Sequence, residues 1–517
     1  MVTTSPRRAT GTRDVARGGL ANLIGAGYAG VASFATTAIV TRIATPEDAG
    51  VYFAAISVLL IAVSMLELGV PVGNVYFISR YRSLGRTNAL RKVLVAGSSP
   101  LLGFCAIALT LAVIFREQLG NAIFGRNVDA AGTVILILCL GAIAAIIADS
   151  TLGATRGFGV MRTTVVADKF VNPTIQLLAL IVLWSVGMTG GPELIGTRVL
   201  AFAAVAGISI PWLLKLVRKS SMPSGQTFRQ SWVPEASMFR EYWAFAGPRS
   251  LGQIAQVAIQ RVDIVLIGLW LGPAEAAVYA AATRFLIFGQ LTAAAIGTAV
   301  QPRISALASR RERSQLQDLY RVSTSWVVLA TWPLYLTFIL EAPTLMLVFG
   351  DDYSRGAILL QLLSAAMLVA TACGAVDAVL LMAGKSTWTM YNAWFALAVN
   401  LALNIWLIPQ LGIVGAAVAW VAAICANNLV PLVQAKIGIG VHPFGRSSML
   451  AMLSATTLFG VLPWLVKSAG GGPIGAVVTL VLAAVVYSLM LWRWRALIEL
   501  DGLLRRRRPS SRGRGEF

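Results

Sequence analysis

Five polar residues recur along one otherwise apolar segment of the chain. A helix advances about 100° per residue, so residues at these spacings fall within an arc of about 80°. A charge that faces lipid near the bilayer centre costs about 2.5 to 3.5 kcal/mol, so this stripe should face an aqueous cavity. We predict that it lines a cavity for the phosphate or sugar groups of a substrate. Its members are Arg249, Gln253, Gln256, Gln260 and Asp263.

Arg261 and Arg284 add two charges at a similar depth. Each lies roughly 11 residues from the Gly272-Pro273 turn, which at 1.5 Å per residue is about 16 Å. Guanidinium groups bind phosphate oxygens through paired hydrogen bonds, so we predict that both arginines join Arg249 in holding a phosphate headgroup. Two alternatives stay open: Asp263 pairs with Arg261 or Arg284 as a buried ion pair, and Arg249 extends to the cytoplasmic face.

Glu67 and Asp263 are the acidic candidates for an ion-coupling site. Glu67 precedes Asn74 by seven residues, which places both on one face of a helix. Glu67 either binds a coupling ion or forms a packed hydrogen bond between helices. We expect no bound cofactor, and a proton gradient, a sodium gradient or the membrane potential as the energy source.

Other residues that could do chemistry are sparse. The cysteines Cys105, Cys139, Cys373 and Cys425 lie far apart in apolar segments with no histidine beside them, which predicts neither a metal site nor a disulfide framework. The Gly384-Lys385-Ser386 sequence lacks a glycine five positions earlier, where Val379 stands, which counts against a nucleotide-binding loop. We predict no catalytic residues and no enzymatic activity.

These residues must be positioned by membrane-spanning helices. The 517 residues are 57% hydrophobic and only 12% charged, with a mean hydropathy of +0.75, which is too apolar for a soluble protein of this length. A spanning helix needs roughly 20 mostly apolar residues, and fourteen such segments follow one another. They lie near 18–43, 50–79, 93–115, 131–153, 165–187, 194–217, 243–271, 275–301, 319–341, 356–383, 387–408, 411–435, 446–466 and 473–494.

The basic residues fix the orientation of these helices. Of the 42 Lys and Arg residues, 33 fall on the face that holds both termini, and three lie inside helices. By the positive-inside rule this face is cytoplasmic. The basic residues predicted on the external face are Arg42, Arg116, Arg126, Arg198, Arg355 and Lys467. External loops this short count against membrane glycosyltransferases and polymer ligases, which need a large external loop for their chemistry.

The chain also repeats itself. Residues 46–55 and 273–282 are identical at six of ten positions, and Asp149 and Asp377 recur near the same offset. The order of the matches indicates two halves inserted in the same orientation, with a substrate site between them. Asn22 is then the first-half counterpart of Arg249, and the positive charge of the cavity is concentrated in the second half.

The repeat gives a domain organisation. We predict a basic tail at 1–17, a six-helix lobe at 18–217, an amphipathic cytoplasmic linker at 218–242, a second six-helix lobe at 243–440, two extra helices at 441–496 and a basic tail at 497–517. The linker is expected to lie as a helix on the cytoplasmic interface, because Trp232, Ala236, Phe239 and Trp243 share one helical face.

Three segments carry a family resemblance: 45–52, 66–70 and 263–268 followed by Val278-Tyr279. Together they resemble the polysaccharide transporter, or Wzx-like O-antigen flippase, family of the multidrug/oligosaccharidyl-lipid/polysaccharide (MOP) superfamily. The resemblance implies a V-shaped fold of two lobes in a bacterial cytoplasmic membrane. It also implies a flippase that moves a polyprenyl-pyrophosphate-linked oligosaccharide to the outer leaflet by alternating access, with polymerases or glycosyltransferases of the same pathway as partners and no role for nucleic acid. The alternatives are a multidrug exporter of the same superfamily and a non-transporting scaffold for glycan assembly.

Overall fold

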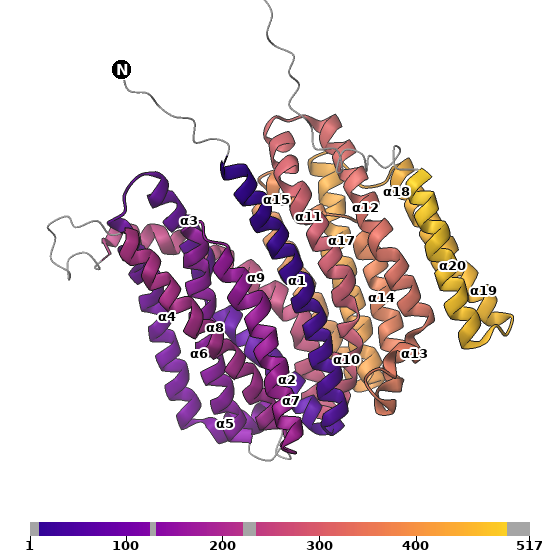
Figure 1. Cartoon of the computed structure of the whole chain (residues 1–517), viewed down its shortest axis with the longest axis horizontal. Helices are drawn as coiled ribbons and strands as arrows, with labels where there is room; N and C mark the ends of the chain where they lie inside the picture. The colour runs from indigo at the N-terminus through magenta and orange to yellow at the C-terminus, as the bar shows by residue number, and fades with distance from the viewer. Residues whose placement is uncertain (1–9, 125–130, 221–233, 494–517) are drawn as a thin grey trace, which may run out of the picture. The chain divides into compact units, whose positions relative to one another are not determined.

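The computed structural model describes residues 10–124, 131–220 and 234–493. Every regular element in these ranges is a helix (Figure 1). Thirteen helices in them are long and apolar enough to span a membrane, and the bent pair Pro273–Arg284 and Leu286–Ser309 is a fourteenth when its two helices are counted as one span. The predicted all-helical class and the predicted count of about fourteen spans are confirmed.

The described residues pack as two compact units. Unit 1 is drawn from Met1–Ile287, Pro343–Leu360 and Met390–Ala423. Its helices are α1 (Thr10–Ile43), α2 (Pro46–Leu66), α3 (Val70–Ser83), α4 (Ala89–Ile114), α5 (Arg116–Phe124), α6 (Ala131–Gly157), the π-helix η1 (Thr164–Val171), α7 (Asn172–Ser185), α8 (Gly191–Ser220), α9 (Ala236–Trp270), α10 (Pro273–Arg284) and the short 3-10 helix η2 (Asp351–Gly356). Helices α6 and α8 run side by side within it (Figure 1).

Unit 2 is drawn from Phe288–Ala342, Gln361–Thr389 and Ile424–Phe517. It holds α12 (Arg313–Leu340), α15 (Val376–Met382), α18 (Arg446–Ala455), the π-helix η3 (Thr456–Val461), α19 (Leu462–Ser468) and α20 (Gly472–Arg493). Within it α12 packs against α18, and the hydroxyl of Tyr487 donates to the Leu329 carbonyl at 3.0 Å. The helices that contribute residues to both units are α11 (Leu286–Ser309), α13 (Ala342–Met346), α14 (Ala357–Ala372), α16 (Ser386–Leu411) and α17 (Ile413–Gly438).

The second predicted helix, 50–79, is broken in the structure. Helix α2 ends at Leu66 and α3 begins at Val70. Between them Leu68 has φ +49° and Gly69 has φ +75°. The left-handed conformation costs a residue with a side chain about 1–2 kcal/mol, whereas glycine adopts it freely. Because neither residue has helical φ, α2 cannot continue into α3 as one helix.

The two copies of the repeated motif meet in unit 1. The motif at 46–55 forms the start of α2, and the motif at 273–282 forms α10. Helices α2 and α10 pack against each other, and a side chain added at Gly50 would overlap the backbone of Pro273. Because the two starts are in contact, both turns lie at the same end of the unit, as expected for halves inserted in one orientation.

Helix α9 begins earlier than predicted. It starts at Ala236 rather than near residue 243, so it takes in the end of the predicted linker, and the expected separate interfacial helix is not formed by residues 236–242. Its first turns are anchored by Tyr242, whose hydroxyl donates to Asn74 Oδ1 at 2.9 Å. Trp232, the remaining member of the predicted apolar face, lies outside the described residues.

Candidate functional site

A cavity of about 240 Å³ in unit 1 gathers an unusual number of charges. Residues from α1, α2, η1, α7, α8, α9 and α10 line it. Its charged lining residues are four cations and one carboxylate: Lys169, Arg198, Arg261, Arg284 and Asp168. The cavity therefore has the charge expected of a site for an anion.

Arg198 is held by neutral groups. Its Nη1 donates to Gln176 Oε1 at 2.8 Å and to Asn172 Oδ1 at 3.4 Å, and its guanidinium group lies over the Phe202 ring at 4.4 Å. These contacts orient the guanidinium group without neutralising it. Its Nε is buried and has no hydrogen-bond partner among the described residues.

Arg284 and Arg261 complete the cluster. The Arg284 guanidinium lies 5.7 Å from the centre of the Phe53 ring, and its Nε is also buried without a hydrogen-bond partner in the described chain. Neither residue, nor Arg198, has a carboxylate within 4.0 Å in the part of the chain that the structure describes. Buried cations without a counter-charge are costly, and buried polar groups normally find partners, so these unpaired donors fit a bound anion.

One sequence-based expectation is wrong here. Arg198 was expected on the external face, because it lies near the start of a helix predicted at 194. Helix α8 instead begins at Gly191, which places Arg198 in the second turn, where it faces the cavity. The first half thus supplies Lys169 and Arg198 to the described lining of the cavity, and the positive charge is not concentrated in the second half as predicted. The only feature of the sequence that could have indicated a cavity position for Arg198 was its place within an apolar segment.

The alternative in which Asp263 pairs with Arg261 or Arg284 is not observed among the described residues. Asp263 is buried and accepts hydrogen bonds from Tyr279 Oη at 2.9 Å and from Asn404 Nδ2 at 2.7 Å. The side-chain oxygens of Asn400 and Asn404 are buried with no donor to them among the described residues. Asn404 therefore turns its Nδ2 to the carboxylate, and its own Oδ1 is left without a partner in the described chain. The ion-coupling role of Asp263 stays a prediction; Tyr279 and Asn404 are its neighbours in the structure.

Glu67, the other predicted coupling residue, lies at the break between α2 and α3. Its Oε1 is buried and has no hydrogen-bond partner among the described residues. The hydrogen bond between helices and the coupling role of Glu67 both stay predictions.

The remaining members of the predicted stripe do not line this cavity. Arg249 is exposed, and its guanidinium group lies over the Phe245 ring at 3.9 Å. Gln253 and Gln260 are exposed, and Gln256 and Asn22 are partly exposed. A binding role for these five residues stays a prediction.

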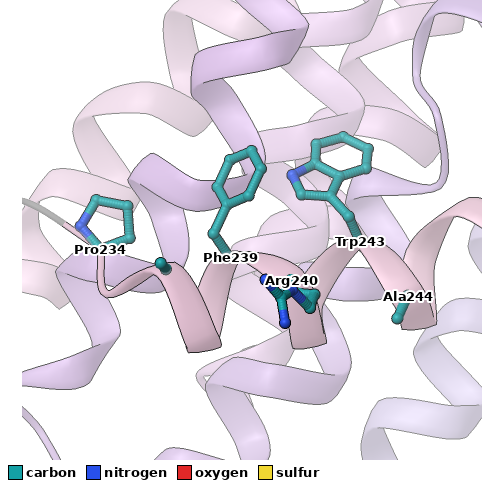
Figure 2. Close-up of a pocket in the computed structure, with 6 residues that line it drawn as sticks. Pro234, Phe239, Arg240, Trp243 and Ala244 are labelled. Carbon is teal, nitrogen blue, oxygen red and sulfur yellow. The ribbon is translucent and has the colours of Figure 1, made fainter.

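A larger and more open hollow of about 710 Å³ lies at the start of α9. Figure 2 shows Phe239 and Trp243 on one side of this helix and Arg240 turned away from them. The Trp243 indole donates to the Ala96 carbonyl at 3.0 Å. Among the described residues Arg240 is the only charged one that lines the hollow. The described part of the hollow therefore lacks the converging polar groups of the cationic cavity.

The family model described as polysaccharide biosynthesis protein matches residues 15–308, more than half of the chain. The chain belongs to the polysaccharide biosynthesis protein family. This confirms the resemblance to polysaccharide transporters of the MOP superfamily, and a second model, MatE, matches residues 248–406 of this family member.

One curated relative of this polysaccharide biosynthesis protein carries a functional name. It is the "Probable low-salt glycan biosynthesis flippase Agl15" of Haloferax volcanii, 23% identical over 169 residues that make up 32% of this chain. The matched part spans only 36% of that relative.

Two solved structures share the fold of this family member. The "Lipid II flippase MurJ" in its inward closed conformation has a TM-score of 0.69 at 12% identity, with 92% of this chain and 99% of that chain covered. An inward-facing multidrug resistance MATE family transporter of the MOP superfamily has a TM-score of 0.65 at 15% identity, with 80% and 94% covered. At these identities the likeness concerns the fold alone.

Proposed function

We propose that this protein is a flippase that carries a polyprenyl-pyrophosphate-linked oligosaccharide from the cytoplasmic to the outer leaflet of the membrane by alternating access. The observation that carries the proposal is the cluster of Arg198, Arg261 and Arg284 in one cavity, with no carboxylate partner in the described chain. A pyrophosphate offers both the negative charge and the paired oxygens that guanidinium groups bind best. Membership in the polysaccharide biosynthesis family supports a glycan as the rest of the substrate.

Each residue has a separate part in this proposal. Arg198, oriented by Gln176 and Asn172, presents a fixed guanidinium group to the pyrophosphate. Arg284 and Arg261 add charge from the two helices on either side of the Gly272 turn. No bond of the substrate is made or broken, so the protein acts as a transporter and not as an enzyme. Asp263, with Asn400 and Asn404, is the proposed site for a coupling cation.

The MatE match favours a second candidate, the export of drug cations. A site for organic cations needs an excess of carboxylates, whereas this cavity has one carboxylate against four cations. The charge of the cavity therefore favours the anionic lipid-linked glycan over a drug cation.

The proposal is tested by replacing the cavity arginines. Arg198→Gln and Arg284→Gln should each lower the appearance of lipid-linked glycan in the outer leaflet by about tenfold or more, because a hydrogen bond to a charged group contributes about 1.5–3 kcal/mol. Arg→Lys at either position should rescue only partly, since an ammonium group keeps the charge and loses the planar fork. The glycan is measured in cells that hold each variant at matched protein level.

Arg116→Gln is the matched control. Arg116 is exposed at the start of α5 in the same unit, so its loss removes an arginine without touching the cavity, and transport should be unchanged. Full transport by both cavity Gln variants would contradict the proposal. Increased sensitivity to cationic drugs on deletion of the protein, with normal glycan export, would favour the exporter instead.

A further inference from the structure

Asp168 is the one carboxylate among the described residues that line the cationic cavity. Its Oδ2 lies 2.7 Å from Nζ of Lys169, its neighbour in the sequence. The two side chains are 27% and 32% exposed, so the pair lies in the cavity wall and remains within reach of a ligand. Among the described cavity cations, Lys169 is thus the one that already has a counter-ion.

Asp168 and Lys169 share the cavity wall although they are neighbours in the sequence. In an α-helix consecutive residues point about 100° apart and do not face each other. Asp168 and Lys169 lie in η1, a π-helix of eight residues, and such segments are rare and frequently occur at functional sites. Both side chains line one cavity and form an ion pair there.

The segment after the pair is held in place by α1. The rings of Tyr28 and Phe170 stack with their centres 5.1 Å apart, and the hydroxyl groups of Tyr28 and Thr174 are 2.7 Å apart. A side chain added at Gly25 would also come within 2.8 Å of Lys169 Cβ. The ion pair therefore has a defined position in the wall.

An anionic headgroup that enters this cavity meets two opposing effects. The three arginines attract it and have no carboxylate of their own within 4.0 Å in the described chain. Asp168 repels it and competes with it for Lys169. A transport site must bind its substrate strongly enough to admit it and weakly enough to let it leave. A carboxylate within a cationic cavity weakens the binding of an anion and so favours its release.

The geometry points to Asp168 as an internal counter-ion that occupies Lys169 and lowers the affinity of the cavity for the pyrophosphate headgroup, so that the headgroup is released. This inference rests on the proposed function, and in it Asp168 sets the affinity of the cavity for the headgroup. Lys169 is then a fourth ligand of the headgroup, available once the headgroup displaces Asp168.

The test is binding of farnesyl pyrophosphate, a soluble isoprenyl pyrophosphate, to the purified full-length protein by titration calorimetry. Asp168→Asn should bind it about tenfold more tightly, because it removes the repelling charge and frees Lys169. Asp168→Ser is a second, smaller variant that should show the same gain. Asp318→Asn is the control, since Asp318 is exposed on α12 in unit 2 and its loss removes the same charge far from the cavity in sequence and in another unit.

A double-mutant cycle separates the counter-ion role from other roles. The gain from Asp168→Asn should largely disappear when Lys169 is replaced by Gln. Unchanged or weaker binding in both Asp168 variants would overturn the inference, as would a gain that persists fully without Lys169. Failure of the proposed function would look different. The Arg198→Gln and Arg284→Gln variants would then bind farnesyl pyrophosphate as tightly as the wild type does.

Discussion

At the scale of single residues, the cavity arginines combine a position in the cavity wall with the lack of a carboxylate partner in the described chain. Elsewhere in the described chain Arg80 pairs with Glu241 and Arg355 pairs with Glu275. Arg198 is surrounded instead by amide oxygens and an aromatic ring. Because no carboxylate neutralises the Arg198 guanidinium group, its charge can attract an anionic ligand.

Asp263 carries the prediction that belongs to this scale. If the carboxylate with Asn400 and Asn404 binds the coupling cation, then Asp263→Asn should remove the dependence of transport on the sodium or proton gradient. The protein should still fold, because an asparagine oxygen can accept the hydrogen bond from Tyr279. The measurement is transport by the variant with and without each gradient. An unchanged gradient dependence would show that Asp263 serves only packing.

At the scale of elements, Tyr242 is one of the residues that fasten the start of α9 to α3 and α4. The Tyr242 hydroxyl donates to Asn74, and side chains added at Gly73 or Gly97 would come within 2.7 Å and 2.6 Å of it. Glycine is needed at these positions because the tyrosine occupies the space where a Cβ would stand. The contact lies close to the α2–α3 break at Leu68 and Gly69.

Gly97→Ala tests this packing. The added methyl group should lower the free energy of unfolding by about 1–3 kcal/mol through overpacking, which exceeds the gain of about 0.5–1 kcal/mol from replacing a helical glycine. Gly103→Ala on the same helix is the matched control, since nothing lies within 4 Å of its added Cβ and its stability should stay equal or rise. Thermal unfolding of both variants in one detergent measures the difference. Equal stabilities would show that Tyr242 has room to move.

The sequence predicted the elements better than the site. Apolar length located all fourteen spans, because each must cross the same hydrocarbon thickness. It missed the break after Leu66 and the early start of α9, because both depend on packing and local backbone conformation. Helical spacing identified Arg261 and Arg284, but Arg198 comes from a distant segment, and only the fold brings its side chain to theirs.

At the scale of the whole molecule, the two halves carry related but diverged polar groups. Tyr52 and Tyr279 occupy the same place in the repeated motif. Tyr52 accepts a hydrogen bond from Gln176, which also accepts one from Arg198, whereas Tyr279 donates to Asp263. In the first half the hydrogen bonds of Tyr52 and Gln176 lead to a cation, Arg198, and in the second half that of Tyr279 leads to an anion, Asp263. This difference fits a phosphate site at Arg198 and a separate coupling-ion site at Asp263.

The orientation of the halves gives a topological prediction. A reporter fused after Arg514 should be cytoplasmic, and cysteines placed in the Pro46 and Pro273 turns should both react with an impermeant reagent added outside the cell. The contact between the starts of α2 and α10 requires that the two turns share a face. Labelling of the two turns from opposite faces would contradict the parallel repeat.

The most direct measurement of the central claim is translocation by the purified protein in liposomes. The probe is a fluorescent, short-chain polyprenyl-pyrophosphate-linked glycan, and a membrane-impermeant quencher reports the fraction that reaches the outer leaflet. We predict that quenching rises above the level of protein-free liposomes with the wild type and with Arg116→Gln, and returns to that level when Arg198 and Arg284 are both replaced by Gln. Quenching by the wild type equal to that of protein-free liposomes, or undiminished in the double variant, would contradict the account.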